Sequence, residues 1–121
     1  MTNTTLTPAQ MAERTGVSLD TLRYYEREGL LDDVTRADNG HRRYSEDDAL
    51  WIEVLRCLRA TGMTIEQLRH YCELGAQGDT TKPERRQILL DHRRLIERQI
   101  EERQEALRLV DHKLEHYREI T

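Results

Sequence analysis

The chain has 121 residues, of which 35% are charged and 36% are hydrophobic. A chain of this size forms about one domain, and its high charged fraction excludes the large apolar core that an enzyme with a deep substrate cavity needs. The 19 basic and 23 acidic side chains give a formal net charge of −4, so any affinity for nucleic acid must come from a local basic patch.

The composition also predicts where the protein works and what it does not contain. The two cysteines form no repeated C-x-x-C pair, which argues against a disulfide scaffold and against a structural zinc site. The first seven residues are polar and no apolar run approaches 18 residues, so we expect neither a signal peptide nor a membrane span. We therefore expect a cytoplasmic protein without a metal ion or a cofactor.

Helix-start and helix-stop signals predict two short helices near the N-terminus. The first covers residues 8–15, between a capping Thr7 and a Gly16 that can adopt the left-handed conformation. The second covers Leu19–Glu28 and can be capped by Ser18. Two short helices joined by a tight turn that contains glycine are typical of a helix-turn-helix.

The helical period disappears after the second helix, and a short hairpin is predicted in its place. Residues 34–36 and 42–44 flank Asn39-Gly40, a strong turn signal. A hairpin of this size is not stable unless it packs against the helices.

Two further helices are predicted beyond the hairpin. Ser45 can cap the third, and three acidic residues follow in its first turn, where the helix dipole favours them. Thr64 can cap the fourth, which we expect to stop at Gly75. The third helix carries a wide apolar stripe suited to the core of a small domain. The stripe consists of Leu50, Trp51, Val54, Leu55, Cys57 and Leu58.

The last third of the chain has the pattern of a coiled coil. Residues 84–121 contain neither glycine nor proline, and side chains that are mostly apolar recur at alternating steps of four and three. Arg93 and Arg103 occupy two of these positions. A helix of about 35 residues would be about 50 Å long, so we expect the same helix of a second copy to cover its seam. The expected dimerisation residues are Leu89, Ile96, Ile100, Leu107, Val110, Leu114 and Tyr117.

The second helix is the first candidate for contact with DNA. We expect Leu19 and Leu22 to face the core. The residues left on or near the outer face are Asp20, Thr21, Arg23, Tyr24 and Arg27. Hydroxyls and backbone N–H groups at a helix start suit phosphate, and arginine can read guanine or bind a phosphate. The alternative is that Tyr24 and Tyr25 are packing residues and the charged groups are ordinary surface. The candidate contacts are Ser18, Thr21, Arg23, Tyr24, Tyr25 and Arg27.

The hairpin is the second candidate, because it concentrates positive charge in a chain that is acidic overall. Asp38 is the only acidic residue between Arg36 and Tyr44. A basic projecting hairpin is typical of the wing of a DNA-binding domain, whereas the alternative is a solvated turn that happens to contain arginines. The candidate contacts are Arg36, His41, Arg42, Arg43 and Tyr44.

These elements together resemble the MerR-type transcriptional regulators. The most specific part of the resemblance is Leu-Arg-Tyr-Tyr-Glu followed by Gly-Leu, with Gly-x-Arg-x-Tyr about a dozen residues later. The likeness covers nearly the whole chain, although His41 stands where the family often has an aromatic residue. The matching segments are residues 11–18, 21–31, 39–44 and 61–65, followed by the long C-terminal helix.

The resemblance implies a mainly α fold with three parts. Residues 5–75 would form a winged helix-turn-helix DNA-binding domain with a short β-hairpin wing, residues 76–83 a linker, and residues 84–119 an antiparallel coiled-coil dimerisation helix. It implies a homodimer that binds double-stranded promoter DNA between two widely spaced promoter elements and distorts it for RNA polymerase. No nucleophile–base–acid set is present, so we do not expect an enzyme. The alternative is a coiled-coil protein-interaction module with a vestigial helix-turn-helix.

A narrower resemblance concerns Cys57. Residues 55–63 and 78–85 are similar to the short, aldehyde- and electrophile-responsive branch of the family, whose members respond through a cysteine in the third helix. This implies that Cys57 is a sensor. The metal-sensing branch has a cysteine at the start of the dimer helix, where this chain has Thr80-Thr81-Lys82-Pro83. The alternatives are a buried, inert cysteine and a regulator that has no inducer.

Overall fold

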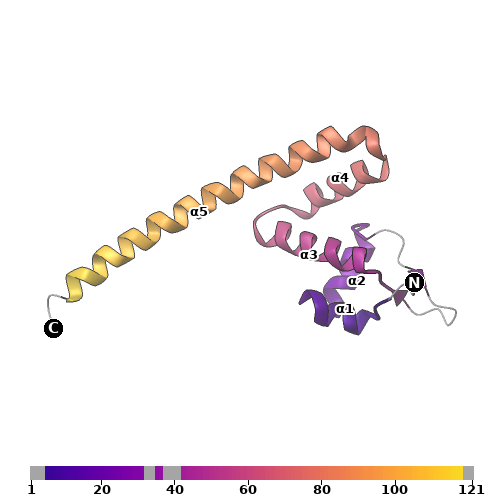
Figure 1. Ribbon diagram of the computed structural model, residues 1–121, viewed down its shortest axis with the longest axis horizontal. Coiled ribbons are helices and arrows are strands. Elements are labelled where there is room, and N and C mark those ends of the chain that lie inside the picture. The colour runs from indigo at the N-terminus through magenta and orange to yellow at the C-terminus, as the bar shows by residue number, and fades with distance from the viewer. Residues whose placement is uncertain (1–4, 32–34, 37–41, 119–121) are drawn as a thin grey trace. The chain divides into compact units, whose positions relative to one another are not determined.

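The computed structural model describes residues 5–31, 35–36 and 42–118 (Figure 1). The chain divides into two compact units, Met1–Thr81 and Lys82–Thr121. The elements in chain order are α1 (Pro8–Thr15), α2 (Leu19–Arg27), β1 (Thr35–Arg36), β2 (Arg42–Arg43), α3 (Glu46–Ala60), α4 (Ile65–Ala76), the 3₁₀ helix η1 (Asp79–Thr81) and α5 (Lys82–Arg118).

The two helices predicted at the start of the chain are present as α1 and α2, and the predicted residues cap them. The Thr7 hydroxyl accepts from the backbone N–H of Gln10 at 3.2 Å, and the Gln10 side chain accepts from the Thr7 backbone N–H at 2.9 Å. Gly16 follows with φ of +73°, a conformation that glycine adopts without steric cost. Ser18 caps α2 by accepting from the backbone N–H of Thr21 at 3.1 Å. The first helix has its predicted bounds, whereas α2 ends one residue earlier than predicted.

The same local chemistry starts α3 and α4. Ser45 and Thr64 both close reciprocal capping boxes, and the first turn of α3 is acidic, as expected. The fourth helix continues to Ala76, one residue beyond the predicted stop at Gly75.

The core of the first unit is formed by side chains between Leu6 and Leu74. Helix α1 packs against both α2 and α3, and the side chains with under 2% exposure include Met11, Leu22 and Leu68. The largest fully buried side chains are Tyr44, Met11, Leu22, Leu30, Ile52, Leu55 and Leu68.

The burial pattern corrects three predicted core positions. Leu19 is 39% exposed, Leu50 is 62% exposed and Cys57 is exposed. The buried face of α3 instead recurs every three residues, and Leu50 lies about 100° around the helix from that face. The buried positions on α3 are Ala49, Ile52, Leu55 and Leu58.

Polar contacts hold α3 and α4 against the helix-turn-helix. The indole N–H of Trp51 donates to the Leu30 carbonyl at 2.8 Å, and the Trp51 ring stacks on Tyr71 with centroids 5.8 Å apart. Arg14 on α1 pairs with Glu46 on α3, and this hydrogen bond lowers the pKa of the Glu46 carboxyl. These contacts join α3 to the end of α1 and to the segment that follows α2.

The two strands pair in an antiparallel register, with Thr35 opposite Arg43 and Arg36 opposite Arg42. A further antiparallel bridge joins Leu6 to Tyr44. The predicted hairpin therefore has its two strands, while its turn at residues 37–41 lies outside the described residues.

The second unit contains the single long helix α5, which has 37 residues. The expected linker at residues 76–83 includes η1, and α5 begins within it at Lys82. Every described side chain from residue 101 to residue 118 is exposed. Among the described residues, no helix is both long and apolar enough to cross a membrane.

Candidate nucleic-acid interface

Helix α2 presents a polar face opposite its buried side. Leu22 and Tyr25 are buried, while the side chain of Arg23 is 59% exposed and Tyr24 is 36% exposed. Arg27 is also exposed. Among the exposed groups of α2, two guanidinium groups and a phenol suit phosphate oxygens and base edges.

Three of the candidate residues, Ser18, Thr21 and Arg23, have contacts within α2 or at its cap. The Ser18 hydroxyl donates to the Thr21 hydroxyl at 2.9 Å and also caps the helix, so its first role is structural. Arg23 lies 3.8 Å from the Asp20 carboxylate, both on the surface. An exposed ion pair of this kind is weak, and a DNA phosphate can replace Asp20 as the partner of Arg23.

The structure corrects the prediction for two tyrosines. Tyr25 is 6% exposed, and burial raises the pKa of its phenol. Tyr44 is 2% exposed, and its hydroxyl donates to Glu26 Oε1 at 3.0 Å. Buried side chains do not reach a DNA surface, so the packing interpretation holds for Tyr25, whereas Tyr24 remains a surface candidate. Tyr44 also packs in the core, although the alternative for the hairpin was a solvated turn.

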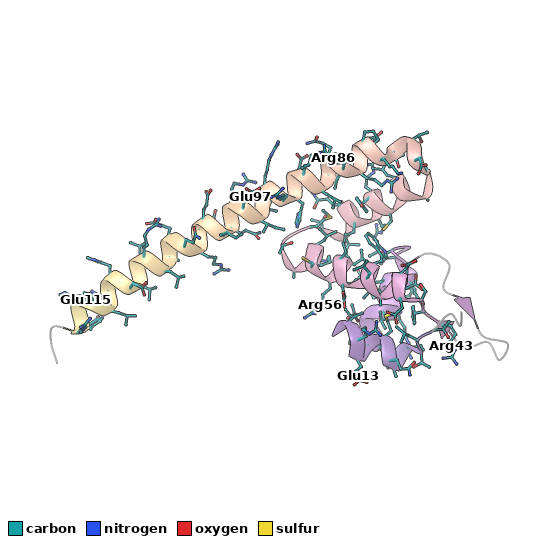
Figure 2. All side chains as sticks on the ribbon, in the orientation of Figure 1. Glu13, Arg43, Arg56, Arg86, Glu97 and Glu115 are labelled. Atoms are coloured by element: carbon teal, nitrogen blue, oxygen red, sulfur yellow. The ribbon has the colours of Figure 1, made fainter. Side chains whose placement is uncertain are left out.

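The hairpin supplies the second set of candidates. The Arg43 side chain is partly exposed, and Figure 2 shows it on the hairpin side of the helical core. The backbone of Arg36 and Arg42 lies in β1 and β2. Their side chains, and the whole of His41, lie outside the described residues.

Two residues with contacts near this interface were not predicted from the sequence. Glu26 holds the Tyr44 hydroxyl, as described above, but its position on a charged helix gave no sign of this contact. Arg56 on α3 donates from Nη1 to the Thr15 carbonyl at 3.2 Å, and Figure 2 shows it directed towards α1. The same Nη1 would lie 3.2 Å from a Cβ at Gly16, so Arg56 covers the turn between α1 and α2.

The predicted sensor residue lies on the surface of α3. Cys57 is exposed, which contradicts the alternative of a buried cysteine. Cys72 is half-buried, and its thiol lies 3.9 Å from the Leu30 carbonyl. The guanidinium of Arg59, two residues from Cys57, donates to the Met63 carbonyl at 2.7 Å.

The predicted coiled-coil positions form an exposed apolar face on the C-terminal half of α5. Leu107 and Leu114 are 61% and 60% exposed. Leu109 is also exposed, at 63%, although it lies outside the predicted seam. Arg93 and Arg103, the two charged positions of the seam, are exposed as well. The exposed fractions at the other predicted seam positions are 38% at Leu89, 51% at Ile100 and 54% at both Val110 and Tyr117, with Ile96 intermediate.

Comparison with known families identifies both parts of the chain. Residues 6–74, more than half of the chain, match the family described as MerR HTH family regulatory protein. Residues 51–113 match a second family description, "MerR, DNA binding". Together these matches cover the helix-turn-helix, the hairpin and most of α5.

Individual relatives agree with the family matches. The chain is 49% identical over 90 residues to the helix-turn-helix regulator AdhR of Bacillus subtilis; the match covers 74% of this chain but only 64% of AdhR, less than two thirds of it. It is 37% identical over 113 residues to an uncharacterised helix-turn-helix regulator of Haemophilus influenzae, covering 93% and 84% of the two chains.

Solved structures have the same fold over nearly the whole chain. HiNmlR, described as a MerR family regulator lacking the sensor domain and bound to promoter DNA, has a TM-score of 0.88 at 36% identity, covering 96% of this chain and 92% of that chain. A MerR family regulator from Listeria monocytogenes has a TM-score of 0.85 at 37% identity, covering 93% and 85%. The helix-turn-helix, the long C-terminal helix and these relatives together show that the chain is a DNA-binding transcriptional regulator of the MerR family.

Proposed function

We propose that this regulator binds promoter DNA as a homodimer, with α2 in the major groove and the hairpin on the flanking backbone. The observation that carries the proposal is the two-sided character of α2, whose Leu22 and Tyr25 are buried while Arg23 and Arg27 are exposed. The description of HiNmlR as bound to promoter DNA supports it. The contacts proposed on α2 are Ser18, Thr21, Arg23, Tyr24 and Arg27.

The proposed dimer is an antiparallel coiled coil of two α5 helices. A twofold axis between them would place two α2 helices in successive major grooves, about 34 Å apart along the duplex. Distortion of the DNA between the half-sites would bring separated promoter elements into register for RNA polymerase, and the cost of that distortion would contribute to sequence preference.

Substitution of Arg23 tests the role of α2. We expect Arg23→Ala to weaken binding to the preferred duplex by about 1–3 kcal/mol and to relax base preference at one position in each half-site. Arg108→Ala removes the same charge from an exposed position on the outside of α5. It should change the affinity by no more than about twofold, which corresponds to about 0.4 kcal/mol. Fluorescence anisotropy on a panel of single-base variants of the duplex measures both effects.

The same titration tests the alternative of a protein-interaction module. If α2 binds DNA, the logarithm of the binding constant falls linearly with the logarithm of the salt concentration, because bound phosphates release counterions. If no salt-dependent binding is detected, or if Arg23→Ala and Arg108→Ala behave alike, the proposed role of α2 is wrong.

We infer that Cys57 is the site at which aldehydes or soft electrophiles act on the protein. A thiolate is the reactive form of cysteine, and the Cys57 side chain is accessible on α3. Addition to an aldehyde forms a sulfur–carbon bond, and a proton passes to the carbonyl oxygen, so no oxidant is consumed. The adduct would lie beside Arg56, which binds the end of α1, so a small displacement of α3 there would reach the helix-turn-helix.

Two cysteine variants separate a sensor from an inert thiol. We expect Cys57→Ser to bind DNA like the native protein but to lose promoter activation by formaldehyde, whereas Cys72→Ser should keep both properties. In-vitro transcription with and without formaldehyde is the measurement. A normal response from Cys57→Ser would contradict the sensor role and leave a MerR-type regulator without this inducer.

A further inference from the structure

The hairpin is too short to determine its own orientation relative to the helices of the domain. Its described ladder has only two residue pairs, Thr35 with Arg43 and Arg36 with Arg42, and an isolated two-stranded hairpin is at best marginally stable in water. The direction in which Arg43 leaves the domain must therefore be set by contacts outside β1 and β2.

Tyr44, directly after β2, makes contacts of that kind. Its backbone N–H donates to the Leu6 carbonyl at 2.9 Å, and its carbonyl accepts from the Leu6 N–H at 2.7 Å. Its side chain crosses to α2, where the hydroxyl donates to Glu26 Oε1 at 3.0 Å. With 2% exposure, Tyr44 joins the base of the hairpin to the last turn of α2.

In the sequence of α2, Glu26 stands between Arg23 and Arg27, which are both exposed. A carboxylate that faced the DNA there would repel the phosphates. Instead the Glu26 side chain is half-buried and accepts the tyrosine hydroxyl. A hydrogen bond to an ionised acceptor is stronger than one between neutral groups, so this contact is well suited to hold the hairpin at a fixed angle to α2.

We propose that Tyr44 and Glu26 are positioning residues, which align the hairpin with α2 so that both contact one DNA site. This inference depends on the proposed role of the hairpin as a wing. Neither residue touches the DNA; the benefit is that the base of the wing is held in place before binding, so less conformational freedom is lost there when the complex forms.

Substitutions of Tyr44 and Glu26 test the hydrogen bond between them. Tyr44→Phe removes only the hydroxyl oxygen, and we expect about tenfold weaker binding to the preferred duplex, the size of effect that one charge-assisted hydrogen bond supports. Glu26→Ala should weaken binding similarly, whereas Glu26→Gln keeps an acceptor oxygen but loses the charge, so it should weaken binding less than Glu26→Ala. If Glu26 acts only by repelling phosphate, Glu26→Ala would tighten binding, and the proposal would be wrong.

A double-mutant cycle separates positioning from general stabilisation. In an Arg42→Ala/Arg43→Ala background, the wing has lost two of its proposed contacts, and Tyr44→Phe should cause a smaller further loss of affinity than in the native protein. A merely structural role would give the same loss in both backgrounds. Anisotropy at a temperature well below every variant's melting point, checked by circular dichroism, measures the cycle.

The cycle also separates this inference from the function on which it depends. If the double arginine variant binds like the native protein, the hairpin is not a wing and both ideas are wrong. If that variant binds weakly while Tyr44→Phe binds normally, the wing is real and only the positioning role is wrong.

Discussion

Leu107→Asp is expected to convert the dimer into a monomer. Leu107 lies in the middle of the predicted seam and is 61% exposed in the single chain, so a second copy is needed to bury it. Loss of leucine burial costs about 2 kcal/mol in each copy, which together weakens the dimer about 1,000-fold. The unpaired carboxylate adds a further desolvation cost. Sedimentation velocity measures the change.

Leu109 provides a matched control for this substitution. It is the same residue type, two positions along α5, and is equally exposed at 63%, but it falls on the outside of the predicted seam. Leu109→Asp should therefore remain dimeric and bind DNA normally. A dimeric, folded Leu107→Asp protein, or dissociation caused equally by both substitutions, would show that the interface is not the predicted seam.

Arg42→Ala/Arg43→Ala is expected to weaken binding to every duplex, whatever its sequence. The wing is proposed to contact the phosphate backbone, which positions the protein without reading bases. Loss of one phosphate contact lowers the slope of log affinity against log salt by about one unit for each half-site. At low salt the loss of affinity should be largest, and at high salt the variant should approach the native protein.

The control for the wing variant removes two arginine side chains from α5 instead of from the hairpin. Arg94 and Arg98 are exposed on α5 and lie outside the predicted seam, so Arg94→Ala/Arg98→Ala should leave the salt slope unchanged. The same slope for the wing variant and for the native protein would exclude the hairpin from the DNA contact.

Helix boundaries were predictable because short-range chemistry determines them. Thr7, Ser18, Ser45 and Thr64 each cap the helix that the sequence predicts, since a capping hydroxyl binds a backbone N–H three residues away. The end of α2 and the end of α4 each differ by one residue, because no side chain signals those positions as clearly.

Burial was less predictable, because it depends on what packs from distant parts of the chain. Tyr24 and Tyr25 are adjacent and identical in type, yet only Tyr25 faces the core. The Tyr44–Glu26 contact joins residues 18 positions apart, and the Arg56–Thr15 contact joins residues 41 positions apart. The 3.5-residue repeat predicts which face of α5 needs a partner, but the partner itself is a property of the assembly.

Selection of binding sites from a random duplex library tests the central claim most directly. A dimer that reads DNA through two copies of α2 should enrich two inverted half-sites, with centres separated by about 10 base pairs or a multiple of that spacing. Leu107→Asp should lose this enrichment, and Leu109→Asp should keep it. Recovery of sequences with no common inverted motif, at a salt concentration where the native protein binds, would contradict the proposal that this protein recognises promoters as a symmetric dimer.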